Sequence, residues 1–200
     1  MRSYLQIALP VGLGVWFLVA MVLRSWLVYR RTGKNPIVLP KDDSAHGYIG
    51  RLFRFVIAGI TLDVAAFAFS EKAYSRLGRL EWAESDIGMI AGLAVLVLST
   101  VIMVIAQAQM GDSWRVGIDA ENHTDLVERG LYRRTRNPIY VGMFGALLCL
   151  VLCIPNALTM VCAGVGYVLI QVQTRLEEEH LGRLHGAAYE AYRRRVPRWV

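Results

Sequence analysis

The sequence predicts an all-α integral membrane protein with about five transmembrane helices. Hydrophobic residues make up 55% of its 200 residues, whereas charged residues make up only 19% and are gathered between apolar runs. Three of these runs have roughly the 20 residues that a helix needs to cross a bilayer. Two shorter runs near the C-terminal end are separated by only two residues, which is typical of a tight helical hairpin.

The three long runs are Leu5 to Val28, Leu52 to Phe69 and Ile87 to Ala106. The first leads directly into basic residues without a small-residue cleavage site, so we expect a retained helix and not a cleaved signal peptide. Arg24, near its end, is expected to extend toward the membrane surface. The second contains Asp63, a costly carboxylate at membrane depth that indicates either a functional group or a polar contact between helices. The third is rich in small residues, which let neighbouring helices approach closely.

The predicted hairpin consists of Ile139 to Ile154 and Ala157 to Val172, joined by Pro155-Asn156. Each arm is short for a bilayer crossing, so the hairpin is expected to lie against the other helices or in a locally thinned membrane. The tail 173–200 is polar but carries apolar residues at helical spacing. It is therefore expected to form an amphipathic helix at the cytosolic surface.

The distribution of lysine and arginine predicts the orientation. The connectors 30–51 and 109–138 and the tail 173–200 carry five, five and six of these residues, whereas the N-terminal start and the connector 71–86 carry one and three. Basic residues are enriched in cytoplasmic segments. Five crossings with the N-terminus outside and the tail in the cytosol place all three basic segments on the cytosolic side.

We interpret 1–200 as one membrane domain, because too little polar sequence remains for a separate soluble domain. Residues 1–108 supply the N-terminal helices, and 109–200 supply a long polar loop, the hairpin and the tail. The net charge of +6 does not indicate nucleic-acid binding, since the arginines lie between apolar runs. The three cysteines lie inside apolar runs without metal-ligand spacing, so we expect neither a metal site nor a disulfide framework.

The polar loop ends in a stretch suited to an anionic ligand. Four arginines fall within eight residues: Arg129, Arg133, Arg134 and Arg136. Asn137-Pro138 follows, and proline fits the first turn of a new helix because it lacks the amide proton. The helix start then offers free N–H groups beside guanidinium groups. The alternative is a basic membrane anchor that precedes a transmembrane helix.

Two motifs give the chain a resemblance to a known family. The first is Leu126-Val-x-x-Gly130-x-Tyr132-x-x-x-Arg136-Asn-Pro138-x-Tyr140-x-Gly142. The second is Arg175-x-Glu177-Glu-Glu179-x-Leu181-x-x-x-x-Gly186-x-x-Tyr189-x-x-Tyr192-x-x-Arg195-Val-Pro197-Arg198. With a hairpin between them, these motifs resemble the isoprenylcysteine carboxyl methyltransferase family and the related phospholipid and thiol methyltransferases. The resemblance covers about the last ninety residues.

The resemblance implies transfer of a methyl group from S-adenosyl-L-methionine to a lipophilic acceptor at the membrane, with lipids as neighbours. It implies that the cofactor lies between the loop, the start of the hairpin and the tail. Glu179 is expected to hold the ammonium group of the cofactor. The implied cofactor contacts are Thr124, Asp125, Leu126, Val127, Tyr132, Asn137, Pro138, Ile139, Tyr140 and Glu179.

The implied catalytic residues are Arg175 and Tyr140, with Arg175 facing the acceptor. A carboxylate acceptor is ionised near neutral pH and would need only orientation by an arginine. The alternative for Arg175 is a salt bridge to Glu179, four residues later on the same helix. Trp114 and Arg115 are expected to line the acceptor entrance, although Trp114 also fits the role of an interfacial anchor.

One position departs from the family pattern. The family usually has histidine before the proline where this chain has Asn137, so a hydrogen-bonding role is expected there and proton transfer is not. The leading acceptor is a carboxylate, and the alternatives are a phospholipid amine or a small thiol. Further alternatives are an NADPH-dependent sterol-type reductase and a non-enzymatic membrane protein.

Overall fold

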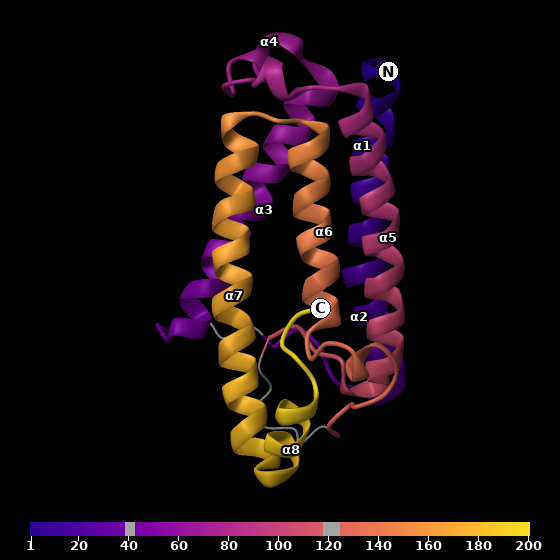
Figure 1. Cartoon of the computed structure of the whole chain (residues 1–200), viewed down its shortest axis with the longest axis vertical. Coiled ribbons are helices and arrows are strands. Elements are labelled where there is room, and N and C mark those ends of the chain that lie inside the picture. Colours follow the sequence, from indigo (N-terminus) through magenta and orange to yellow (C-terminus); the bar gives the residue numbers. More distant parts are fainter. Residues whose placement is uncertain (39–42, 118–124) are drawn as a thin grey trace.

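The structure is a computed structural model that describes residues 1–38, 43–117 and 125–200. Within these ranges the chain is helical and contains no β-strand. Four helices are long and apolar enough to cross a membrane, and a fifth apolar helix of 16 residues is shorter. Figure 1 shows them as an elongated bundle, with the N-terminus at one end and α8 at the other. The predicted all-α integral membrane protein is confirmed.

The first crossing is one helical rod built from three segments. Helix α1 spans Arg2–Phe17, a π-helical segment spans Leu18–Leu23, and α2 spans Arg24–Thr32. The rod ends at Gly33, whose φ of 69° is readily adopted only by a residue without Cβ. π-Helical turns inside α-helices are rare and are frequent at functional sites.

The next two crossings begin with side-chain caps. Helix α3 spans Ala45–Phe69, and the Ser44 hydroxyl accepts a hydrogen bond from an amide of its first turn. Helix α5 spans Asp86–Met110 and is capped in the same way by Ser85. Such caps satisfy amides that have no partner within the helix. The short helix α4, Glu71–Ser75, and a 3-10 turn, Glu81–Ala83, connect them at the N-terminal end of the bundle.

The C-terminal half forms the hairpin. Helix α6 spans Pro138–Cys153, α7 spans Ala157–His185 and α8 spans Ala187–Arg195. Two 3-10 turns, Gly111–Ser113 and Gly130–Arg133, precede it. The structure differs from the expected tail in two respects: α7 continues through residue 173 as a single helix of 29 residues, and a separate helix, α8, follows Gly186. No proline or glycine interrupts its backbone where the sequence changes from apolar to polar, so the helix continues.

Small residues bring α5 and α6 close together, as the sequence predicts. A Cβ atom built on Gly145 would lie 1.9 Å from the Ser99 hydroxyl, and one built on Gly92 would lie 2.5 Å from the Cys153 sulfur. Cys149 and Cys153 are buried at this contact, and Cys162 is buried between α3 and α7. The cysteines are therefore small core residues, as expected.

Asp63 joins α3 to the hairpin. One carboxylate oxygen accepts a hydrogen bond of 2.8 Å from Asn156 Nδ2, and the other accepts one from the Thr159 hydroxyl. Asn156 also caps α7 through the Thr159 amide. Of the two interpretations of this carboxylate, the structure favours the polar contact between helices, because the side chain is buried and both of its oxygens have partners.

Candidate functional site

The loop before α6 is fixed against the end of α5. The Leu131 amide donates a hydrogen bond of 2.8 Å to Gln109 Oε1. Gly130 allows this approach, since its φ is 61° and a Cβ there would overlap the Gln109 side chain at 2.1 Å. The Tyr192 hydroxyl, from α8, donates a hydrogen bond of 2.8 Å to the Tyr132 carbonyl. The loop and tail therefore meet, as the paired motifs predicted.

The start of α6 is joined to α7 and to the end of the chain through Asn137. Its side-chain amide donates hydrogen bonds to Glu178 Oε1 at 3.0 Å and to the Arg198 carbonyl at 3.3 Å. Pro138 occupies the first turn of α6, as expected. Asn137 therefore fills a purely hydrogen-bonding position, and its lack of a titratable proton does not weaken these contacts.

Glu178 is the central residue of this junction. Arg136 donates to both of its carboxylate oxygens at 3.2 and 3.1 Å, and Arg198 does the same at 3.1 and 2.9 Å. The Glu178 side chain is only 7% exposed. Two bidentate arginine contacts and one amide saturate this carboxylate, so it holds the loop, α7 and the tail together.

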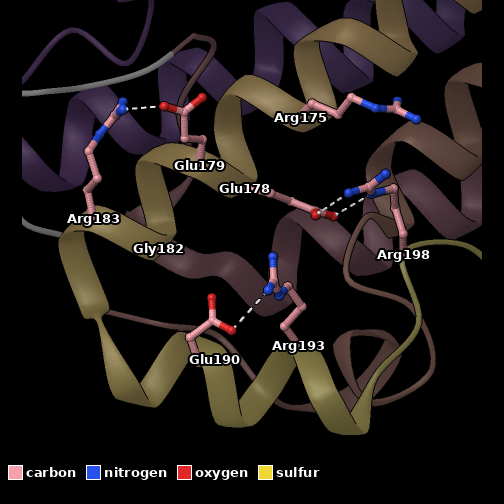
Figure 2. A pocket seen from close by; sticks show the side chains of 8 residues that line it. All are labelled: Arg175, Glu178, Glu179, Gly182, Arg183, Glu190, Arg193 and Arg198. Atoms are coloured by element: carbon pink, nitrogen blue, oxygen red, sulfur yellow. Dashed lines mark hydrogen bonds and ion pairs between the residues drawn. The ribbon is translucent and has the colours of Figure 1, made fainter.

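The outer face of α7 forms a polar hollow of about 340 Å³, here called the outer recess. Figure 2 shows its acidic residues paired with arginines: Glu179 with Arg183 at 2.6 Å and Glu190 with Arg193 at 3.0 Å. Arg175 donates instead to the carbonyl and side chain of Gln171. The eight lining residues are Arg175, Glu178, Glu179, Gly182, Arg183, Glu190, Arg193 and Arg198.

The expected alternative for Arg175, a salt bridge to Glu179, is therefore wrong. Both side chains are exposed, and each bonds a different residue four positions away on α7. An exposed arginine or glutamate on a helix can pair with any of several neighbouring side chains, so sequence spacing alone does not determine its partner.

The inner face of α7 carries a different arrangement. The Tyr140 hydroxyl, from α6, donates a hydrogen bond of 2.5 Å to Glu177 Oε1, and Gln173 Nε2 donates one of 2.8 Å to the same oxygen. No described residue donates to Glu177 Oε2. We call Tyr132, Tyr140, Gln173 and Glu177 the inner cluster. Sequence reasoning missed Gln173 and Glu177, although their spacing of four residues places them on one face of a helix.

Tyr132 lies at the edge of the inner cluster. Its hydroxyl is buried and has no hydrogen-bond partner among the described residues. Burial raises the pKa of this hydroxyl well above its ordinary value, the nearby Tyr192 and Glu177 raise it further, and the positive charge of Arg24 opposes them. Tyr132 is therefore a neutral donor on which an acidic and a basic side chain both act.

The remaining predicted site residues are distributed around this region. Asp125 is exposed, Val127 and Ile139 are half-buried, and Leu126 packs against the buried Tyr189 and Tyr192 of α8. Thr124 lies outside the described residues.

Two expectations for the polar residues nearest the membrane surface are wrong. Trp114 is only 2% exposed and lies 5.9 Å below the guanidinium of Arg24, so it is not an interfacial anchor. Arg24 is 8% exposed and turns into the bundle, not toward the membrane surface. Arg115 donates to the carbonyls of Asp112 and Trp114 and holds the backbone beside it.

Comparison with known proteins gives two findings. The sequence pattern of the phospholipid methyltransferase family matches residues 87–188, which include the loop, the hairpin and the inner cluster. A methanethiol S-methyltransferase of Crocosphaera subtropica is 41% identical over 66 residues. That similarity covers 33% of this chain and 25% of the relative, so the match spans a quarter of the relative's length.

Proposed function

The chain belongs to the phospholipid methyltransferase family, and we propose that it uses S-adenosylmethionine to methylate an acceptor that partitions into the membrane. The reaction is a displacement in which the bond between the sulfonium sulfur and the methyl carbon breaks while a bond to the acceptor atom forms. The products are the methylated acceptor and S-adenosylhomocysteine. In such a reaction the protein mainly positions the two reactants and excludes water.

The observation that carries this proposal is the state of Glu177. Two neutral donors, Tyr140 and Gln173, hold one oxygen of its carboxylate, and the other oxygen receives no hydrogen bond from the described residues. A half-buried carboxylate without a cationic partner favours a positively charged ligand group. The ammonium group of S-adenosylmethionine has the required charge and donors, and its sulfonium adds a second positive charge.

Glu177 takes the role that the sequence resemblance gave to Glu179. The Glu179 side chain is 63% exposed and already paired with Arg183, so a cofactor ammonium there would compete with water and with an arginine. Glu177 lies beside Tyr140, the second predicted catalytic residue, and faces the loop that carries Tyr132. We propose that Tyr140 orients Glu177 and contacts the cofactor along with it.

A small thiol is the first acceptor to test, because the similar protein from Crocosphaera subtropica is named as a methanethiol S-methyltransferase. A lipophilic carboxylate is the second. For it, Arg175 is supported only by its exposed position beside the recess, since α7 turns it away from the Tyr140–Glu177 pair. We also propose that the end of the bundle with α8 faces the cytosol, because the basic segments gather there.

Calorimetric titration of the purified protein in detergent with S-adenosylmethionine, and separately with NADPH, tests the proposed cofactor. We expect saturable binding of S-adenosylmethionine and none of NADPH. Binding of NADPH alone, or of neither compound, would overturn the proposal. A methyl-transfer assay with radiolabelled donor then compares methanethiol, N-acetyl-S-farnesylcysteine and phosphatidylethanolamine as acceptors.

A further inference from the structure

Arg24 comes from a part of the chain that the family pattern does not cover. It follows the π-helical segment Leu18–Leu23 directly and is the first residue of α2. A π-turn shifts the angular register of the residues after it, and the Ala20 carbonyl within this segment accepts a hydrogen bond of 2.8 Å from Gln107 of α5. The distorted turn thus lies against α5, and the arginine that follows it is buried.

The positive charge of Arg24 has no acidic partner within the described residues. One of its nitrogens donates to the Gly111 carbonyl at the end of α5, while its buried Nε has no hydrogen-bond partner. Asp112 acts electrostatically on Arg24 but forms no ion pair with it, and instead pairs at the surface with Arg31 at 3.9 Å. A buried charge without a directly paired carboxylate is costly, so it favours the binding of an anion beside it.

Tyr132 adds a second donor without a partner. Its side chain is 7% exposed, and its hydroxyl is also unsatisfied among the described residues. The charges of Arg24 and Glu177 both act on this hydroxyl. An arginine and a tyrosine hydroxyl together offer the N–H and O–H groups that bind a carboxylate. Trp114, beneath the guanidinium, keeps that side chain in place.

We propose that Arg24 and Tyr132 bind a carboxylate group inside the bundle. The inference rests on the proposed function, because the carboxylate belongs either to the methionine part of S-adenosylmethionine or to the acceptor. The cofactor source is favoured because both Arg24 and Glu177 act on the Tyr132 hydroxyl. The methionine part of S-adenosylmethionine carries both a carboxylate and an ammonium group. Its carboxylate would contact Arg24 while its ammonium group contacts Glu177. The first helix of the chain would then complete the site built by the C-terminal half.

A purely structural role for Arg24 makes a different prediction. The contact with Gly111 places a positive charge at the C-terminal end of α5, where a cation stabilises the helix. Such a role does not involve the Tyr132 hydroxyl. Replacing Tyr132 by phenylalanine removes one unsatisfied donor, so on structural grounds alone it would leave the fold and ligand binding unchanged.

The test compares Arg24→Gln and Tyr132→Phe with the wild-type protein and with Arg30→Gln. Arg30 is a matched control. Like Arg24 it belongs to α2 and lies over a tryptophan ring, that of Trp26 at 4.9 Å, but its side chain is exposed. Calorimetry in detergent measures the affinity for S-adenosylmethionine and for decarboxylated S-adenosylmethionine, which lacks only the carboxylate. A thermal unfolding curve for each variant checks that it is folded.

For a cofactor carboxylate, we expect the wild-type protein and Arg30→Gln to bind decarboxylated S-adenosylmethionine about 10- to 100-fold more weakly than the intact compound. Arg24→Gln and Tyr132→Phe should bind the intact compound more weakly and lose most of this discrimination. For an acceptor carboxylate, both variants should keep wild-type cofactor affinity but show a raised KM for N-acetyl-S-farnesylcysteine and an unchanged KM for methanethiol.

Unchanged cofactor affinity together with unchanged KM in Tyr132→Phe and Arg24→Gln would overturn the carboxylate site while leaving the proposed function intact. The same holds if Arg24→Gln fails to fold and Tyr132→Phe behaves as wild type. Failure of the wild-type protein to bind S-adenosylmethionine would overturn the proposed function and, with it, this inference.

Discussion

The outer recess and the inner cluster lie on two faces of the same helix and treat acidic residues in opposite ways. In the outer recess, Glu178 and Glu179 of α7 and Glu190 of α8 each pair with at least one arginine. On the inner face, Glu177 is held only by the neutral side chains of Tyr140 and Gln173. The recess is hollow, yet its carboxylates are already paired with arginines of the protein itself.

This difference separates structural from ligand-binding glutamates. A carboxylate that is saturated by arginines has little to offer a ligand, whereas one held by neutral donors alone can still pair with a cationic ligand group. Glu178 and Glu177 are adjacent in sequence but differ in this respect. The outer recess is therefore not the place where we expect the cofactor.

The largest effect is expected for Glu178→Ala. It removes the carboxylate that accepts from Asn137 and from Arg136, which is 9% exposed, and breaking one partner of a buried ion pair costs about 3–5 kcal/mol. The thermal unfolding midpoint in detergent should fall sharply. The matched control is Glu179→Ala, next to it on the exposed face, which should change stability by less than about 1 kcal/mol. Equal losses in the two variants would contradict a structural role specific to Glu178.

Glu177→Gln is expected to weaken S-adenosylmethionine binding about 10- to 100-fold, because it removes the charge that faces the ammonium group. The amide preserves the side-chain shape, so the unfolding midpoint should stay close to that of the wild type. Calorimetric titration measures the affinity. In Glu179→Gln the affinity should stay within about twofold, and a larger loss there than in Glu177→Gln would reverse the assignment of the two faces.

Tyr140→Phe is expected to have a smaller effect on the same affinity. It removes the 2.5 Å hydrogen bond to Glu177 but leaves the one from Gln173, so a loss of about 1 kcal/mol, or roughly fivefold, is expected. Tyr167→Phe provides the control, because Tyr167 is an exposed tyrosine of α7 that packs against Phe144. Wild-type affinity in Tyr140→Phe would exclude Tyr140 from the positioning of Glu177.

The smallest effect is expected for Glu190→Gln, which removes the exposed pair with Arg193 in the outer recess. Exposed pairs of this kind contribute about 0.2–0.5 kcal/mol to stability. Both the unfolding midpoint and the cofactor affinity should match the wild type within error. A clear loss of cofactor affinity would show that the outer recess binds the ligand after all.

The sequence was sufficient for the fold and for the meeting of loop and tail. Long apolar runs, the break at Pro155-Asn156 and the excess of small residues in 87–106 each predicted a feature that the structure contains. Tyr189 and Tyr192 are buried against the loop, as their spacing indicated. These predictions succeed because they depend on hydrophobic periodicity and on helix-breaking residues, which act locally.

The assignment of individual charges could not be made in the same way. Glu177-Glu178-Glu179 is a run of one residue type, and which member points inward depends on the rotation of α7, which only packing fixes. Arg24 resembles any basic residue near the end of a transmembrane segment. Its burial depends on the π-helical turn before it, for which the sequence carries no signal.

Because α7 is one continuous helix, the positions of its side chains at one end of the bundle depend on how the helix is held at the other end. Asn156, fixed by Asp63, determines the rotational phase at which α7 begins, and the helix then runs without a break to the three glutamates. Each residue advances that phase by about 100°. Adding or deleting one residue in the middle of α7 would therefore exchange the positions of these glutamates relative to Tyr140 and Arg136. The polar contact at Asp63 therefore helps to determine which glutamate faces Tyr140 at the other end of α7.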